Sequence, residues 1–168
     1  MLATAKPTAY SLRGSPMSRL AVTQGRIPTM TSEAIEKVAA MEKLSLQLPQ
    51  VDIETSHILH GGMYARSIMI PAGVMLTGAL IKIATILIVS GDVIAYIGDE
   101  TIELTGYNVL PASANRKQAF VAKTDVYMTM IFASNALSVA QSEEQFTDDA
   151  NRLLSRQMNN KVTITGEL

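Results

Sequence analysis

The chain has 168 residues, of which 48% are hydrophobic and 17% are charged, and its formal net charge is −1 at pH 7. This much apolar side chain excludes a disordered protein, and the length suits one domain with tails. The balanced charge excludes a protein that binds nucleic acid through an overall positive field, so we expect no specific nucleic-acid partner. The absence of cysteine excludes disulfides, thiolate metal sites and thiol nucleophiles.

Residues 1–30 are rich in small and polar residues and lack a regular spacing of apolar side chains. They contain no acidic residue, and their basic residues are Lys6, Arg13, Arg19 and Arg26. This composition predicts an extended N-terminal arm with little fold of its own. We expect the four cations to bind an acidic surface of a protein partner; the alternative is a terminus without a fixed partner.

Residues 31–48 are expected to form a short helix and a linker. Thr31 or Ser32 can cap the helix, which we expect to extend to Leu44. Apolar residues recur every three positions, at Ile35, Val38, Met41 and Leu44. This spacing places them near one face of a helix.

Residues 49–136 contain short runs rich in β-branched residues, separated by turn residues. The expected strands are Arg66–Ile70, Ala79–Val89, Val93–Ile97, Thr101–Leu104, Asn108–Leu110, Gln118–Ala122 and Val126–Ala133. Strands at this spacing without helices between them predict an antiparallel sandwich or barrel, because a parallel sheet needs crossover helices. In the last run, both sets of alternating residues are partly apolar, so we expect this strand to be covered on both faces.

The most apolar stretch, residues 68–97, is interrupted by proline, glycine and charged residues. A membrane-spanning helix needs about 20 unbroken apolar residues, so no membrane association is expected.

Residues 137–168 are expected to form a C-terminal helix and a strand-like tail. Ser142 and Gln145 have the spacing of a capping box, which predicts a helix from Ser142 to Met158. Its apolar stripe is expected to pack on the strands. The tail, residues 161–166, could add to an open sheet edge.

Three segments within residues 64–134 carry a resemblance to the cupin superfamily: residues 70–73 (IPAG), 86–92 (ILIVSGD) and 106–113 (GYNVLPAS). Cupins show apolar strands that end in turns of this kind, in this order. The resemblance implies a mainly β fold, an antiparallel jelly-roll or cupin-like barrel. Along the chain, an extended N-terminal arm and a short helix would precede this barrel, and a C-terminal helix would follow it. Residues 57–66 (HILHGGMYAR) are similar to small cupin-like proteins encoded by tailed bacteriophages.

A metal-dependent cupin carries two histidines and a glutamate in its first motif and a further histidine after the later turn. Here residues 71–90 contain no His, Asp or Glu, and the implied ligand positions fall among Thr77–Leu80 and at Ala84. The last ligand position aligns with Arg116, whose guanidinium cannot bind a metal ion. We therefore expect no metal, no cofactor and no enzymatic activity.

Two further sets of residues are weaker candidates for a site. His57 and His60 are the only histidines and could bind a metal, but a third ligand is not evident, and structural roles are expected. Tyr64, Tyr107, Arg116 and Lys117 are possible contacts for a ligand at the barrel mouth.

These inferences predict a non-enzymatic phage virion structural protein, in particular a capsid decoration or cement protein. Its jelly-roll body would form a homo-oligomer, a dimer or trimer, and its arms would bind the major capsid protein or another virion protein. It would lie on the capsid surface, and in the host cytoplasm during assembly. The alternatives are a metal-free cupin that binds a small molecule or sugar, and a tail-associated virion component.

Overall fold

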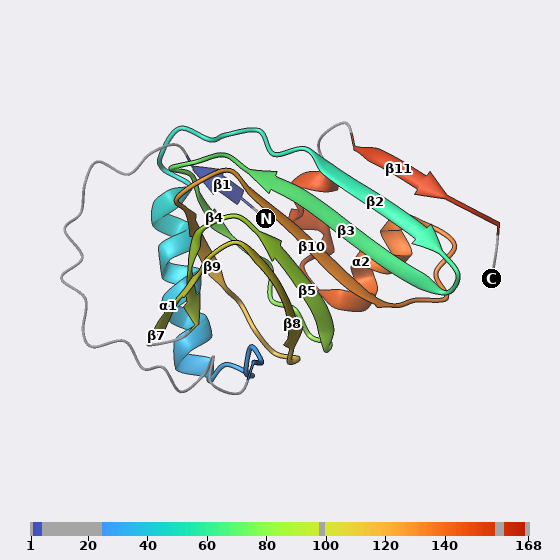
Figure 1. Ribbon diagram of the computed structural model, residues 1–168, viewed down its shortest axis with the longest axis horizontal. Coiled ribbons are helices and arrows are strands. Elements are labelled where there is room, and N and C mark those ends of the chain that lie inside the picture. Colours follow the sequence, from blue (N-terminus) through green and yellow to red (C-terminus); the bar gives the residue numbers. More distant parts are fainter. Residues whose placement is uncertain (1, 5–24, 98–99, 157–159, 167–168) are drawn as a thin grey trace.

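Two β-sheets face one another in the computed structural model, which describes residues 2–4, 25–97, 100–156 and 160–166 (Figure 1). The five-stranded sheet contains, in spatial order, β1 (Leu2–Thr4), β4 (Met75–Thr77), β9 (Ala119–Ala122), β6 (Val93–Ile97) and β7 (Glu100–Leu104). The six-stranded sheet contains β11 (Lys161–Ile164), β2 (Thr55–His60), β3 (Met63–Ile70), β10 (Val126–Ala133), β5 (Thr85–Ser90) and β8 (Tyr107–Ala112). The mainly β, jelly-roll-like architecture is as predicted, although the two sheets stay separate and do not close into one continuous barrel.

The core lies between the sheets because successive side chains of a strand point to opposite faces. In β10, Val126, Met128, Met130 and Phe132 are buried, and the residues between them are less buried or exposed. The bounds of β6 and β10 agree with those expected. The expected strand over residues 79–89 is shorter, because residues 79–84 cross between the sheets and pair only through a bridge from Ile81 to Arg116.

Helix α1 (Ser32–Ser45) agrees with the predicted N-terminal helix. The Thr31 side chain accepts a hydrogen bond from the Ala34 backbone N–H at 3.2 Å, which satisfies one of the free donors at the helix start. The helix packs beside β1 and β4. A buried ion pair of 2.8 Å between Glu42 and Lys117 ties it to the chain before β9.

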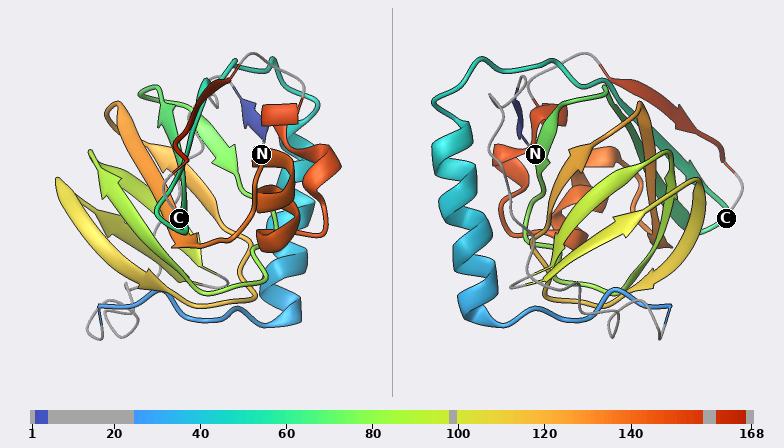
Figure 2. Two further views of the ribbon diagram at one scale, coloured as in Figure 1. Left: turned by 90° about the vertical axis from the view of Figure 1, so that its right-hand side faces the viewer. Right: turned by 60° about the vertical axis from the view of Figure 1, so that its left-hand side comes forward.

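Helix α2 (Val139–Phe146) begins earlier and ends earlier than predicted. Ser138 is the N-cap, and its side chain accepts from the Gln141 N–H, so Ser138 and not Ser142 starts the helix. Ser142 is buried within the helix and donates to the Ser138 carbonyl. After Phe146 the chain forms two short 3-10 helices, Ala150–Arg152 and Leu154–Arg156. Together they cover one end of the sandwich (Figure 2).

Both ends of the described chain join the sheets. Strand β11 pairs in parallel with β2, as the strand-like tail predicted. Strand β1 pairs with β4, and the buried Ile27 exchanges backbone hydrogen bonds with Pro111 and Ser113. The predicted arm over residues 1–30 therefore includes parts of the body, and its remaining residues, 1 and 5–24, lie outside the described residues. No helix in the described residues could span a membrane.

We expect Gly91→Ala to lower the free energy of unfolding by about 2–4 kcal/mol, because Gly91 has a φ of +119° and a Cβ there would lie 2.5 Å from the Asp125 carbonyl oxygen. Gly106→Ala is the control: its φ is +66° but no atom lies within 4 Å, so the loss should be about 1 kcal/mol. Urea unfolding measures both. Equal losses would show that the close approach at Gly91 is not important.

Candidate functional site

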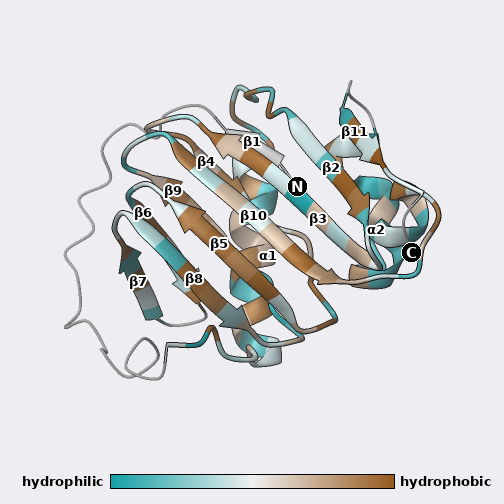
Figure 3. Ribbon diagram, turned by 45° about the vertical axis from the view of Figure 1, so that its right-hand side comes forward, coloured by the Kyte–Doolittle hydropathy of each residue, from teal (hydrophilic) through white to brown (hydrophobic). Residues whose placement is uncertain are grey.

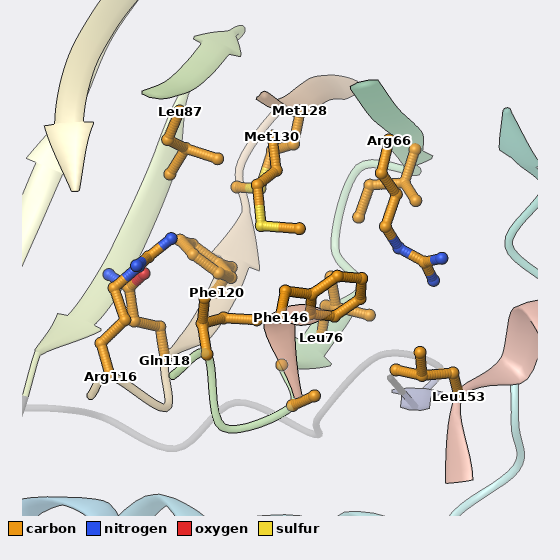
Figure 4. A pocket seen from close by; sticks show the side chains of 14 residues that line it. Arg66, Leu76, Leu87, Arg116, Gln118, Phe120, Met128, Met130, Phe146 and Leu153 are labelled. Carbon is orange, nitrogen blue, oxygen red and sulfur yellow. The ribbon is translucent and has the colours of Figure 1, made fainter. Parts of the chain in front are cut away.

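A cavity of about 70 Å³ lies between the two sheets. Most of its wall is apolar, with side chains from Leu76, Leu87, Phe120, Met128, Met130 and Phe146 (Figure 4). Its polar lining residues are Arg66, Arg116 and Gln118. Arg116 and Gln118 lie at one side of the cavity and Arg66 at the other, with Phe146 between them (Figure 4).

Arg116 is 2% exposed and lies inside the sandwich. One guanidinium nitrogen, Nη1, donates to the carbonyl oxygens of Ile83, Ala112 and Ser113 at 3.2, 3.4 and 2.5 Å, and Nη2 donates to Thr85 Oγ1 at 2.6 Å. No ion pair joins Arg116 to a carboxylate among the residues that the structure describes. Burial lowers the pKa of Arg116 to about 10, so it remains a cation at neutral pH.

The lining residues do not fit the metal ion that a cupin-like fold implies. Gly78 and Ala79 lie at the cavity, where the resemblance places ligands, and neither has a side-chain donor. The Arg116 guanidinium has only N–H donors and cannot bind a metal ion, and Gln118 could offer no more than one amide oxygen, which is too few ligands for a metal site. Nowhere in the described part of the chain do three or more His, Asp or Glu residues gather in a group suited to a metal ion.

A buried carboxylate beneath α2 organises the polar groups on the Arg66 side. Glu143 is 1% exposed, and its Oε1 accepts from Arg66 Nη1 at 3.0 Å and from Ser155 Oγ at 2.5 Å. Its Oε2 accepts from Arg156 Nε at 2.5 Å, which raises the pKa of Arg156. One carboxylate thus links β3, α2 and the last 3-10 helix, and it neutralises the charge of Arg66.

His57 and His60 lie on opposite faces of β2 and do not converge on one metal ion. His57 is buried, and its Nδ1 lies 2.8 Å from the Tyr64 hydroxyl. Burial, aided by the charge of Arg66, lowers the pKa of His57 to about 4. Burial raises the pKa of Tyr64 to about 12, so both groups are neutral at pH 7. His60 is exposed, and its Nδ1 lies 2.6 Å from Thr165 Oγ1.

The four residues expected at a barrel mouth do not meet at one opening. Tyr64 is fully buried among aromatic rings, and Lys117 is held by Glu42 and the Gly78 carbonyl. Tyr107 is 70% exposed at the end of β8 that pairs with Ser90, whereas Arg116 binds Thr85 at the opposite end of β5. Only Arg116 of the four lines the cavity.

Of the predicted partner-binding cations, Arg26 is exposed. The other three, Lys6, Arg13 and Arg19, lie outside the described residues.

The outer face of the six-stranded sheet carries a second candidate site, an uncharged surface that covers four adjacent strands. We call it the outer face; its residues are Met63, Ala65, Ser67 and Met69 of β3, Tyr127, Thr129, Ile131 and Ala133 of β10, Ile86, Ile88 and Ser90 of β5, and Tyr107, Val109 and Pro111 of β8. Figure 3 views the molecule from this side. The two-sided apolar pattern of residues 126–133 was the signal for this surface, but the sequence could not show that four strands share it.

Comparisons with protein-family models and with curated proteins give no match. Among solved structures, a cupin superfamily protein from Desulfitobacterium hafniense is 15% identical, with a TM-score of 0.41 over 50% of this chain and 79% of that chain. Ectoine synthase from P. lautus is 17% identical, with a TM-score of 0.42 over 55% and 71% of the two chains. A variant of salicylate 1,2-dioxygenase from Pseudoaminobacter salicylatoxidans is 10% identical, with a TM-score of 0.45 over 67% and 34%.

We expect Glu143→Gln to lower the free energy of unfolding by about 3 kcal/mol or more, because it leaves the buried Arg66 without its counter-ion. Asp148→Asn removes an exposed carboxylate that pairs with Lys82, and its loss should stay below about 1 kcal/mol. Denaturant unfolding measures both. A small loss for Glu143→Gln would contradict a structural role for the cluster.

Protonation of His57 should make the protein less stable in mild acid. The unfolded chain binds a proton at His57 near pH 6.5 and the folded chain only near pH 4, so the free energy of unfolding falls as the pH falls between these values. From pH 7 to pH 5 this contribution is about 2 kcal/mol.

Urea unfolding at the two pH values tests this for the wild type and for His57→Gln, which should lose that part of the pH dependence. His60→Gln removes the other histidine from the exposed face of the same strand and is the matched control. The same pH dependence in His57→Gln as in the wild type would refute the assignment.

Proposed function

We propose that the protein is a non-enzymatic structural protein whose cupin-like body assembles into a homo-oligomer, a dimer or trimer, through the outer face. One observation carries this proposal: none of the outer-face residues on β3, β10, β5 and β8 is charged. An exposed apolar surface that covers several strands is typical of an interaction site, because a soluble monomer gains by placing charges there.

The arrangement of the outer face supports contact with a second copy of the chain. Ala65, Ile131 and Ile86 lie side by side on β3, β10 and β5 and form an apolar row across the sheet. The row continues to Pro111 on one side and Ile58 on the other. Beyond it, at the edge strand, Lys161 and Glu54 form an exposed ion pair of 2.6 Å. An apolar centre with a polar rim is the usual composition of a protein–protein interface.

The lumen supports a role without metal-dependent catalysis. Its polar lining residues are two arginines and one glutamine, and the carboxylate that pairs with Arg66, Glu143, also accepts hydrogen bonds from Ser155 and Arg156. A carboxylate held by three donors has little remaining capacity to act as a base.

A virion is the assembly that we propose for this oligomer, with the protein on the capsid surface as a decoration or cement protein. The similarity of residues 57–66 to phage-encoded cupin-like proteins supports this setting, and the cationic residues Lys6, Arg13 and Arg19 suit an acidic surface of the major capsid protein or another virion protein. The protein would occur in the host cytoplasm before it joins the particle.

We expect Ile86→Glu to convert the oligomer to monomers, because Ile86 is 42% exposed in the apolar row, between Ile131 and Pro111, and a carboxylate there would be buried without a partner. Light scattering with size-exclusion chromatography measures the mass. Leu44→Glu is the matched control, since Leu44 is 67% exposed on α1, away from the outer face, and its change should leave the mass unaltered. A monomeric wild type would contradict the proposal.

Replacing Lys6, Arg13 and Arg19 by glutamine should lower occupancy on purified particles at least tenfold and leave the fold unaltered. These substitutions are a better test than deletion of the arm, because deletion would also remove β1 and the buried Ile27. Co-sedimentation with particles and mass spectrometry measure occupancy, and Lys43→Gln on α1 is the control. Absence of the wild-type chain from the particles would argue against the virion setting.

A further inference from the structure

We propose that a second copy of the chain packs on the outer face with its strands running in the opposite direction, so that Tyr107 of each copy lies against Pro111 of the other. The two copies are related by a two-fold axis that crosses the strands. This inference rests on the proposed function, because it states how two outer faces meet. It also makes the homo-oligomer a dimer.

The register of the six-stranded sheet arranges the side chains of the outer face in rows that cross the strands (Figure 3). One row, which we call the long row, contains in spatial order Met69, Tyr127, Ser90 and Tyr107. The apolar row lies four residues away along each strand, and the corresponding positions are Ala65, Ile131, Ile86 and Pro111. On β3, β5 and β8, the shorter side chain of one row corresponds to the longer side chain of the other.

Two-fold symmetry allows these rows to fit one another. In an isologous contact, residue i of one copy meets residue j of the other, and j of the first meets i of the second. An axis that crosses the strands midway between the rows, at Val109 of β8, places the long row of each copy over the apolar row of the other. Tyr107 then meets Pro111, and Ile86 enters the gap that Ser90 leaves between two tyrosines. Close packing of this kind is typical of the centre of a protein–protein interface.

A two-fold axis along the strands fits the same surface less well. Glu54 lies beside Met69, because the next residue of β2 pairs with Ile68. An axis along β10 would therefore place Tyr107 on Glu54, which already pairs with Lys161, and Tyr127 on its own copy. Two large rings in contact would hold the surfaces apart and leave the shorter side chains of the apolar row without a partner.

Charge at the ends of the strands also favours the axis across the strands. Three acidic residues lie at the end of the sheet next to the long row: Asp52 before β2, Asp92 after β5 and Asp125 before β10. Lys161 and Lys123 at that end are paired with Glu54 and Glu103. The end next to the long row is therefore acidic.

Arg26 lies at the opposite end of β8. The backbone N–H of the next residue, Ile27, donates to the Pro111 carbonyl at 2.9 Å, and the Arg26 side chain is exposed. An axis across the strands brings Arg26 of each copy to the acidic end of the other copy. An axis along the strands would bring the two acidic ends together, and like charges in contact weaken association.

Cysteine cross-linking tests the arrangement, because the chain contains no cysteine of its own. Chains with Tyr107→Cys are co-expressed with chains that carry Pro111→Cys, and the purified protein is treated with a short, rigid bifunctional maleimide. We expect a covalent dimer on a denaturing gel. Either variant alone should give little of it, since its two cysteines would lie about 13 Å apart along the strands. Tyr107→Cys with Glu54→Cys is the control for an axis along the strands and should not cross-link.

The mass of the wild type, measured by light scattering with size-exclusion chromatography, separates failure of this inference from failure of the proposed function. A dimer that cross-links through positions 107 and 54, or that does not cross-link through 107 and 111, would overturn the arrangement and leave assembly through the outer face intact. A trimer would overturn it in the same way. A monomer would contradict the proposed function itself.

Arg26→Glu tests the arrangement without changing the centre of the interface. It should raise the dissociation constant of the dimer about tenfold or more at low salt, and less at high salt, because exposed charges are screened. Sedimentation equilibrium measures the constant. Lys43→Glu makes the same change of charge on α1 and should leave the constant unaltered. An unaltered constant for Arg26→Glu would show that Arg26 does not face the acidic end of a second copy and would overturn the arrangement.

Discussion

The buried carboxylate of Glu143 holds the C-terminal part of the chain against the six-stranded sheet, and the interior of the molecule depends on this attachment. It binds Arg66 on β3 and Arg156 at the end of the last 3-10 helix. Through this contact Phe146 and Leu153 are held at the wall of the cavity, and Phe146 stacks with Tyr64. Glu143 pairs with both Arg66 and Arg156, and this attraction offsets much of the free energy that is lost when the charged groups leave water.

The interior is therefore divided into two electrostatic environments. On the α2 side, Arg66 is neutralised by Glu143, and His57 and Tyr64 are kept uncharged by burial. These groups stabilise the fold. On the opposite side, Arg116 is held by carbonyl dipoles and retains its charge next to apolar walls. The arginines at the two ends of the cavity are thus held in different ways, Arg66 by a carboxylate and Arg116 by carbonyl oxygens and a hydroxyl group.

The six-stranded sheet is apolar on both faces, and this explains why the mean hydropathy of the chain is as high as +0.20. Its inner face packs in the core, with Met128 and Met130 of β10 among the buried side chains. Its outer face exposes Ile86 and Tyr127, which is unusual for a sheet that only has to fold. Self-association would bury the apolar side chains of the outer face. The cavity lies on the opposite, inner side of the same strands.

The sequence by itself determined the elements whose signals are local. The capping residue Thr31 predicted α1, and the alternation in residues 126–133 predicted β10. The start of α2 at Ser138 was missed because two serines four residues apart offer similar caps, and the burial of Ser142 decides between them. Only the tertiary structure decided that Arg66 meets Glu143 and that four strands share one uncharged face. It also decided that Arg116 meets no carboxylate among the residues whose placement the structure gives. These properties depend on residues far apart in the chain, and strand pairing brings them together or keeps them apart.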